Sequence, residues 1–178
     1  NLNFVNNKFI SNVADGSVAY IQGSNNRIFF EGNVFQNNQA AEGGVIYFSQ
    51  LSFANFFQCR LCRFQKNQAF TSGGILIIDG YSHRIDISLS TFFDNFAQLD
   101  GGCFYFKCVS ECLNTNVRID SCTFKGNEVK RYGGVLAYNK NVEHTTGIRI
   151  TIQLTKSEFI NNIGNERGGV IYASGFKS

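Results

Sequence analysis

Short apolar runs alternate with polar stretches along the whole chain. One type of run follows a glycine pair and is almost continuously apolar, as in Val45–Phe48 and Ile75–Ile78. A second type precedes a Phe and alternates apolar with polar residues, as in Ile85-Asp86-Ile87. Alternation with a period of two predicts a half-buried strand, and no apolar stripe with helical spacing reaches the length of a helix. The pattern therefore predicts two strands in each unit and an all-β fold.

The two types of run belong to a unit that occurs six times. Each unit contains Phe-x-x-Asn, then a short gap, a glycine pair (Gly16-Ser17 in the first copy) and an apolar run. Successive units begin 26, 29, 28, 32 and 35 residues apart, and self-similarity at such a period is typical of solenoids. The repeated residues are Phe9, Phe35, Phe64, Phe92, Phe124 and Phe159, with Asn12, Asn38, Asn67, Asn95, Asn127 and Asn162.

Units of this length, with short strands and no helix, predict the turns of a parallel β-helix. Equivalent residues of neighbouring turns then stack about 4.8 Å apart. We expect the Phe column to form an interior aromatic ladder, and the Asn column to form an amide ladder that satisfies buried backbone groups. The glycine pairs permit a positive φ or a close backbone approach at a tight corner. The prediction is about six turns of 26–35 residues, right-handed because parallel crossovers have that hand.

The repeat resembles that of the chlamydial polymorphic membrane proteins, in which Phe-x-x-Asn occurs together with Gly-Gly-(Ala/Ile/Leu/Val). The second motif is present at residues 43–46, 73–76, 133–136 and 168–171. Similar repeats occur in large surface proteins of ciliates and other microbes, and the high Asn, Phe and Ile content suits an AT-rich genome such as that of a ciliate. The resemblance implies a right-handed, pectin-lyase-like β-helix at the cell surface or outside the cell, often with an adhesive role.

Composition and charge exclude several classes of protein. The chain is 43% hydrophobic and 15% aromatic, which excludes a disordered segment. Its 16 basic and 13 acidic residues are too balanced to indicate a nucleic-acid partner. No apolar run approaches the roughly 18 residues of a membrane-spanning helix, so no transmembrane segment is expected.

Candidates for catalysis are few. A β-helix lyase or hydrolase needs carboxylates clustered with Arg or Lys on one outward face. The best candidates are Asp86, Arg118 and Asp120 on adjacent second strands, but a solvated ion pair between Asp86 and Arg118 is the favoured explanation of this group. The remaining acidic candidates fall on turns in unrelated columns, and they are Asp15, Asp79, Asp94 and Asp100. We therefore expect no catalytic residues and no cofactor.

No metal site is expected either. His83 and His144 lie in loops between strands, where solvated side chains are expected. Cys59-x-x-Cys62 provides only two of the four ligands that a structural zinc site needs. Cys59 and Cys103 occupy core columns. Cys62 and Cys122 lie two turns apart, too far for a disulfide. Cys108 and Cys112 flank a short loop and are the candidates for a local disulfide.

One aromatic column has two interpretations. Tyr20, Tyr47, Tyr105 and Tyr172 share one position after the glycine pair, interrupted by Ile77 and Ala137. If the neighbouring column points inward, these Tyr side chains point outward and form an interaction row for sugars or partner proteins. The alternative is packing on the sheet surface that only stabilises the ladder.

These observations predict one β-helix domain over residues 1–178, a segment of a longer solenoid or filament. The expected function is that of a non-catalytic extracellular structural and interaction module, part of an adhesin or a filament shaft. A carbohydrate-active enzyme is the alternative. Because Leu2 and Phe4 already occupy core positions and a strand follows Gly168-Gly169, the expected partners are further turns or subunits stacked end to end. Glycans and cell-surface proteins are the other candidate partners.

Overall fold

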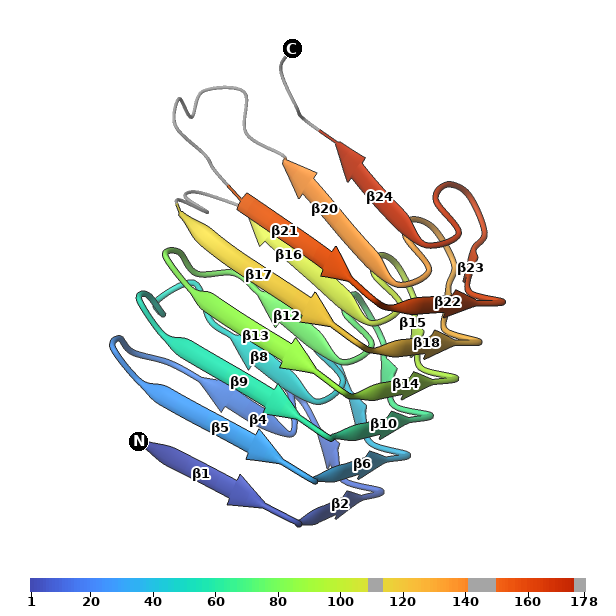
Figure 1. Cartoon of the computed structure of the whole chain (residues 1–178). Helices are drawn as coiled ribbons and strands as arrows, with labels where there is room; N and C mark the ends of the chain where they lie inside the picture. The colour runs from blue at the N-terminus through green and yellow to red at the C-terminus, as the bar shows by residue number, and fades with distance from the viewer. Residues whose placement is uncertain (109–113, 141–149, 175–178) are drawn as a thin grey trace.

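The computed structural model describes residues 1–108, 114–140 and 150–174, which form four parallel sheets of six strands each (Figure 1). Each coil contributes one strand to every sheet, so the chain returns to the first sheet five times and ends in a sixth coil. The strands in front run toward the right of Figure 1, and those behind return toward the left as the chain rises, which makes the coil right-handed. The described ranges contain no helix. The predicted all-β parallel β-helix is confirmed.

The first and second sheets form the front and one side of the coil. The strands of the first sheet are β1 (Leu2–Val5), β5 (Arg27–Glu31), β9 (Phe56–Arg60), β13 (Arg84–Ser88), β17 (Thr115–Asp120) and β21 (Ile150–Thr155). Those of the second sheet are β2 (Lys8–Ile10), β6 (Val34–Gln36), β10 (Arg63–Gln65), β14 (Thr91–Phe93), β18 (Thr123–Lys125) and β22 (Glu158–Ile160).

The third and fourth sheets complete the coil. The strands of the third sheet are β3 (Val13–Ala14), β7 (Gln39–Ala40), β11 (Gln68–Ala69), β15 (Phe96–Ala97), β19 (Glu128–Val129) and β23 (Ile163–Gly164). Those of the fourth sheet are β4 (Ala19–Ile21), β8 (Ile46–Phe48), β12 (Leu76–Ile78), β16 (Phe104–Cys108), β20 (Leu136–Lys140) and β24 (Ile171–Ser174).

The structure has four strands per coil where the sequence pattern predicts two. The additional strands belong to the second and third sheets, and they are only three and two residues long. In β14 a single residue, Phe92, points inward, and in β15 only Ala97 is buried. One buried residue in a strand cannot produce an alternating pattern, so a search for period two does not find these strands.

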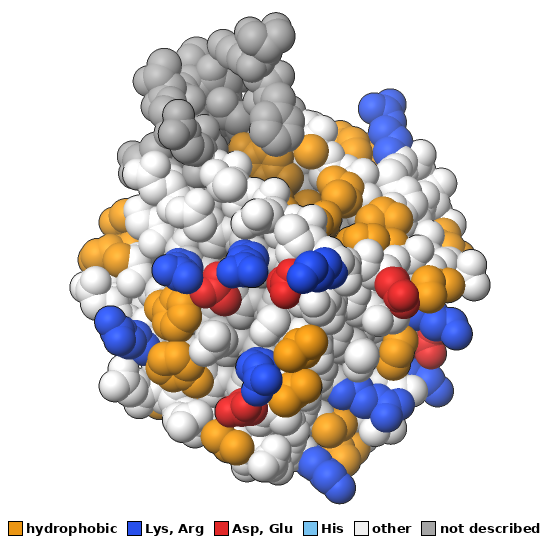
Figure 2. Space-filling model, viewed as in Figure 1, with side chains coloured by type: hydrophobic (Ala, Val, Ile, Leu, Met, Phe, Trp, Pro, Cys, Tyr) orange, Lys and Arg blue, Asp and Glu red, His pale blue; other side chains and the backbone are white. Residues whose placement is uncertain are grey.

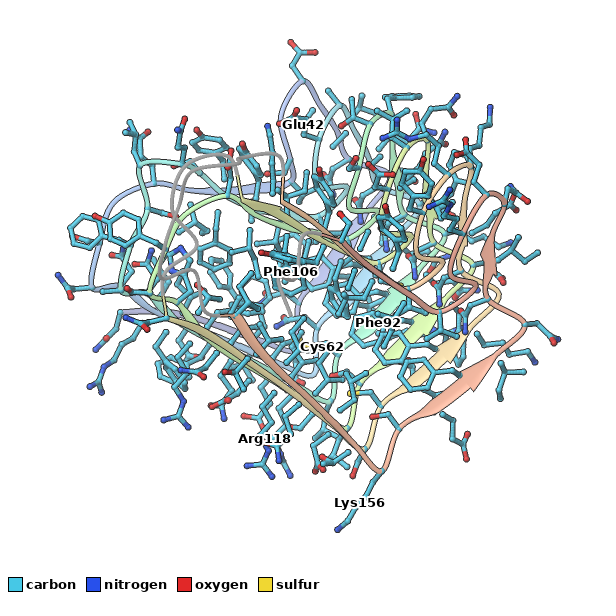
Figure 3. The ribbon with its side chains drawn as sticks, turned by 90° about the horizontal axis from the view of Figure 1, so that it is seen from above. Glu42, Cys62, Phe92, Phe106, Arg118 and Lys156 are labelled. Atoms are coloured by element: carbon cyan, nitrogen blue, oxygen red, sulfur yellow. The ribbon has the colours of Figure 1, made fainter. Side chains whose placement is uncertain are left out.

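The core is a set of columns, because the strands stack without a shift in register. In β13 the side chains of Ile85 and Ile87 are buried, and Ile87 is aligned with Cys59 and Ile119 on the strands on either side. The facing columns on the fourth sheet include Phe104 in one and Phe106 in the other, both buried. Figure 3 shows Phe92, Phe106 and Cys62 inside the coil, with Arg118 and Lys156 outside it. The inward alternation expected for the second type of run is confirmed.

Residues with positive φ occur in all four corner columns of the described chain, although the Gly16-Ser17 corner of the first coil contains none. The corner between the third and fourth sheets uses the first glycine of each pair, with φ of 55–71°. The other three corners use mostly non-glycine residues, with φ of 48–65°. The column between the first and second sheets is Asn6, Gly32, Leu61, Leu89, Ser121 and Lys156. The left-handed conformation is thus a property of all four corners and not of the glycine pairs alone.

The second glycine of each pair is required for a different reason. A Cβ on Gly74 would collide with the carbonyl oxygen of Gly102 in the next coil, and one on Gly44 would collide with that of Gly74. The backbones approach this closely because Gly74 N–H donates to the carbonyl of Gly101 at 3.1 Å. The pair therefore combines one residue in the left-handed region with one at which neighbouring coils leave no room for a side chain.

Candidate functional site

The repeated asparagines form a continuous amide ladder at the corner between the second and third sheets. Each Nδ2 donates to the Oδ1 of the Asn one coil further on, at 2.8–3.0 Å. From the second coil onward, Nδ2 also donates to a Phe carbonyl of the preceding coil, at 2.9–3.1 Å. Asn95 in addition accepts two bonds from Asn67, which completes the capacity of its amide. These interior amides have no donor or acceptor left for a ligand.

The repeated phenylalanines stack inside the coil. The six rings lie with centroids 4.5–5.1 Å apart and planes 4–8° from parallel. Phe35, Phe64, Phe92 and Phe124 are fully buried, whereas Phe9 and Phe159 in the end coils are partly exposed. The Phe column therefore contributes to the core and not to a surface site.

At two further corners, side chains accept hydrogen bonds from backbone N–H groups of the preceding coil, and we call these residues capping residues. The repeated Phe and Asn do not reveal them. At the first corner Cys62 N–H donates to Ser90 Oγ, and at the fourth corner Asn26 N–H donates to Asn55 Oδ1. As in the Asn ladder, each capping residue directly follows a residue with positive φ and binds the backbone of the coil before it. Several residue types alternate along these columns, as Cys62, Ser90 and Cys122 do, so no single letter recurs in every coil. Their position is the signal that could have revealed them, since at the first corner the capping residue lies two residues before the repeated Phe.

His83 is one of these capping residues, and the expectation of a solvated loop histidine is wrong for it. It is only 1% exposed; its Nδ1 accepts from Asn55 N–H at 3.3 Å, and its Nε2 lies 3.2 Å from Ser52 Oγ. Burial lowers the pKa of His83 to about 4, so the ring is neutral at physiological pH. The Asn55 N–H needs a hydrogen-bond acceptor at this position of the fourth corner, and the neutral imidazole of His83 supplies it. His144 lies outside the described residues.

The described cysteines lie buried in the core, as structural cysteines do. Cys59, Cys62, Cys103 and Cys122 are all buried and unpaired, and Cys62 and Cys122 are separated by Ser90 in their column. Burial raises the pKa of Cys122 to about 11 and keeps its thiol protonated. The candidate disulfide between Cys108 and Cys112 lies outside the described residues, since nothing is described of the Cys108 side chain.

The tyrosine column faces outward but is not an open aromatic row. Tyr20 is 55% exposed and lies 5.4 Å from Tyr47, but Tyr47, Tyr105 and Tyr172 are partly buried. Ile77, between Tyr47 and Tyr105, is fully buried, as is Ala137. The column is covered because the backbone of the third corner, at Gly73, lies directly against the Ile77 side chain. The expected interaction row is therefore reduced to Tyr20 and part of Tyr47.

The outer face of the first sheet carries a band of alternating basic and acidic side chains (Figure 2). Asp86 and Arg118 are aligned on β13 and β17, as expected, but the ion pair of Asp86 is with Arg84, at 3.0 Å. Asp120 accepts from Thr155 Oγ1, and this bond holds its pKa below the usual range. Two shallow depressions, of about 220 and 270 Å³, flank the Arg118 side chain. These candidate residues lie together on a polar, open surface.

A second polar group lies on the outer face of the fourth sheet, next to the tyrosines. Asp79 Oδ2 accepts from Tyr47 O–H at 3.0 Å and lies 3.7 Å from Lys107 Nζ, which is 3.6 Å from Glu42 Oε1. Figure 3 shows Glu42 on the outside of the coil. Asp79 and Asp100 lie outside the strands, on the connecting segments where they are expected, but both are buried, and Asp100 pairs with Arg131 at 2.6 Å.

Neither group provides a metal site or a membrane segment. Among the residues that the structure describes, no three His, Cys, Asp or Glu side chains are grouped so that they could hold a metal ion. Asp15 and Asp94 belong to no such group. The described part of the chain likewise contains no helix long and apolar enough to cross a membrane.

Comparison with protein families finds the Chlamydia polymorphic membrane protein repeat at residues 34–49 and 156–174. The first match runs from β6 to β8, and the second from the corner before β22 to the end of β24. Each therefore contains a Phe-x-x-Asn motif and the glycine pair that follows it. Comparisons with curated proteins and with solved structures gave no match. The chain is thus a parallel β-helix in which two of the six coils match the repeat of the Chlamydia polymorphic membrane proteins.

Proposed function

We propose that the chain is a non-catalytic structural and interaction module of an extracellular surface protein, serving as a segment of an adhesin or a filament shaft. The observation that carries this proposal is the complete use of the repeated residues in contacts between coils. The interior Asn amides are saturated by the coils above and below, and the Phe rings stack on one another and pack against other core rings such as Phe30 and Phe104. The repeated residues build the shaft, and the residues on its outer faces differ from coil to coil.

The electrostatics of the outer face support this proposal over a carbohydrate-active enzyme. A general acid for glycoside hydrolysis needs a carboxyl group with a raised pKa. Asp120 has a lowered pKa because it accepts a bond from Thr155, and Asp86 is paired with Arg84. Asp79 does have a pKa raised by burial, but it is enclosed by Tyr47 and Lys107 and is almost inaccessible to a substrate.

The partners in this proposal are of two kinds. Further coils, from the same polypeptide or from another copy, stack on the ends, where each edge strand has a neighbour on one side only. Glycans or cell-surface proteins bind the sides. Arg118 is suited to such a contact, because its guanidinium makes no ion pair or hydrogen bond within the described residues and lies between two shallow depressions.

The test combines a binding measurement with a turnover measurement on the same samples. The purified chain is incubated with neutral and acidic polysaccharides and with purified surface glycoproteins. Retention on a sensor surface, release of reducing ends and formation of unsaturated sugars are then measured. We expect saturable binding of at least one probe without any product, and weaker binding for Arg118→Ala than for Lys125→Ala on the second sheet.

The carbohydrate-active alternative makes the opposite prediction. Product that accumulates beyond one equivalent of protein and disappears in Asp86→Asn or Asp120→Asn would overturn the proposal. Absence of binding to every probe would also count against an interaction role and leave only the shaft.

A further inference from the structure

The group around Asp79 joins three neighbouring coils at one point. Ile78 is aligned with Phe106, so the next residues, Asp79 and Lys107, are neighbours on adjacent rungs of the fourth sheet. Lys107 Nζ lies 3.7 Å from Asp79 Oδ2 and 3.6 Å from Glu42 Oε1. Tyr47, one coil below Asp79, donates its O–H to the same Oδ2 at 3.0 Å. An amine, a carboxyl group, a second carboxyl group and a phenol therefore meet at one place.

One atom of this group is anomalous. The Asp79 side chain is only 5% exposed, yet its Oδ1 is buried and has no hydrogen-bond partner. Buried carboxylate oxygens are normally satisfied, so an orphan oxygen of this kind needs an explanation. Asp100, which pairs with Arg131 on the same side of the coil, has a similar orphan Oδ1. The two sites differ in their cation: a guanidinium stays protonated and is not a nucleophile, whereas an amine can be one.

We propose that Lys107 and Asp79 condense into an intramolecular amide bond, which links β12 and β16 covalently. The orphan Oδ1 is the oxygen that leaves. In the product, the remaining oxygen keeps its bond from Tyr47, and the buried, unpartnered atom no longer exists. The same condensation is closed to Asp100, since its partner is an arginine.

The reaction is balanced by the groups already present. Lys107 Nζ, after losing a proton to Glu42, attacks Cγ of the protonated Asp79 carboxyl group, and a C–N bond forms. The negative charge that develops on Oδ2 is stabilised by the Tyr47 hydroxyl. Glu42 returns the proton to the Oδ1 hydroxyl, the C–O bond breaks and one water leaves, and the nitrogen then releases its second proton to Glu42, which leaves a neutral amide. No oxidant, metal or cofactor is consumed, because an amine and a carboxylic acid give an amide and water.

The surroundings favour each step. Burial raises the pKa of Asp79 and so favours the protonated carboxyl group that the attack requires. Burial and the Asp79 charge also raise the pKa of Tyr47, so its phenol remains a donor. The strand register holds amine and carboxyl group together in one molecule, which replaces an encounter in solution by a contact already made. Glu42 is partly exposed, so the released water can escape.

The decisive experiment is the intact mass of the purified, denatured 178-residue chain. We expect a mass lower than that of the sequence by one water, and a proteolytic fragment in which the peptide containing Lys107 is joined to the one containing Asp79. Lys107→Arg keeps the positive charge but removes the amine nucleophile, so this variant should have the full mass. Lys66→Arg, an exposed change on another corner, is the matched control and should retain the loss.

Two further variants test the mechanism and a competing dehydration. Glu42→Gln should form the bond more slowly, as followed by the mass over time after refolding. Asp79 precedes Gly80, so a cyclic imide at this bond would also lose one water. That imide would still form in Lys107→Arg. Wild-type chain at its full mass, or a water loss that persists in Lys107→Arg, would overturn the proposal. The intact mass of the wild-type chain tests the proposed bond even if a variant fails to fold.

Discussion

At the scale of single residues, the corners of the coil share one arrangement. A residue in the left-handed conformation is followed by a residue whose side chain or backbone contacts a neighbouring coil. Leu61 and Leu89 adopt φ of 55° and 51°, although a left-handed conformation costs a non-glycine residue about 1–2 kcal/mol. Backbone bonds to the next coil hold them there, as in Leu61 N–H to the Ser88 carbonyl. The positive φ of the glycine pairs could be predicted from sequence. That of the leucines could not, because the cause lies in the neighbouring coil.

The second glycine of the pair leads to the first prediction. Gly74→Ala should destabilise the chain by about 1–3 kcal/mol, because the added Cβ meets the Gly102 carbonyl oxygen at a point where the bond from Gly74 N–H to the Gly101 carbonyl holds the two backbones together. Gly16→Ala is the control, since nothing lies within 4 Å of its Cβ. Urea unfolding of both variants measures the difference. Equal midpoints would show that the coils can separate locally.

The amide ladder leads to the second prediction. Asn95→Ala removes the partners of Asn67 N–H and of the Phe64 carbonyl, both inside the coil, and should cost about 1–3 kcal/mol. Asn12→Ala, in the exposed first coil, should cost less. The measurement is again the free energy of unfolding. A neutral Asn95→Ala would mean that water replaces the amide at this corner.

The third prediction concerns His83 and pH. In the unfolded chain His83 binds a proton near pH 6.5, whereas in the folded chain its pKa is about 4. Between these values the unfolded chain holds the extra proton, so stability should fall as pH decreases through this window and become constant below about 4. The loss is on the order of 3 kcal/mol. His83→Asn, which keeps an acceptor as at Asn55, should remove this component when the two pH profiles are subtracted. Parallel profiles would contradict the assignment.

At the scale of elements, the register of a column could be predicted where the same residue recurs in every unit. The burial of a column could not be predicted where it depends on the path of the surrounding backbone. The register of the Phe and Asn columns could be predicted because both residues recur in all six units. The covering of the tyrosine column could not, since Ile77 is buried by the backbone of Gly73 in the corner before β12, a contact that depends on the path of the chain through that corner. The same limit applies to the group around Asp79, whose members come from four positions that share no repeated letter.

The fourth prediction belongs to the second sheet. Phe92→Ala should cost about 3–5 kcal/mol, because it opens a cavity between the rings of Phe64 and Phe124, at 4.9 and 4.5 Å. Phe93→Ala, the next residue in β14, points outward and should cost much less. Thermal unfolding of the two variants checks this contrast. Similar melting temperatures would remove Phe92 from the ladder.

At the scale of the whole molecule, the sides and the ends differ in kind. The sides are closed by the sheets and corners, whereas the first and sixth coils expose apolar side chains such as Val13, at 76%, and Ile163, at 48%. Each end also has strand edges with unpaired backbone groups. The fifth prediction is that residues 1–178 alone associate in solution, because another copy can cover these edges. Sedimentation at several concentrations measures this, and a monomer throughout would contradict end-to-end stacking.

The alignment of the coils residue for residue has a consequence for how the length of the gene can change. One unit, from one Phe to the next, occupies one complete circuit and raises the chain by one strand spacing, about 4.8 Å. Recombination that duplicates or deletes a whole unit therefore changes the length of the rod without disturbing the phase of any ladder. A gene for such a chain can grow or shrink by single units, and the protein at each step remains a folded rod with a different outer surface.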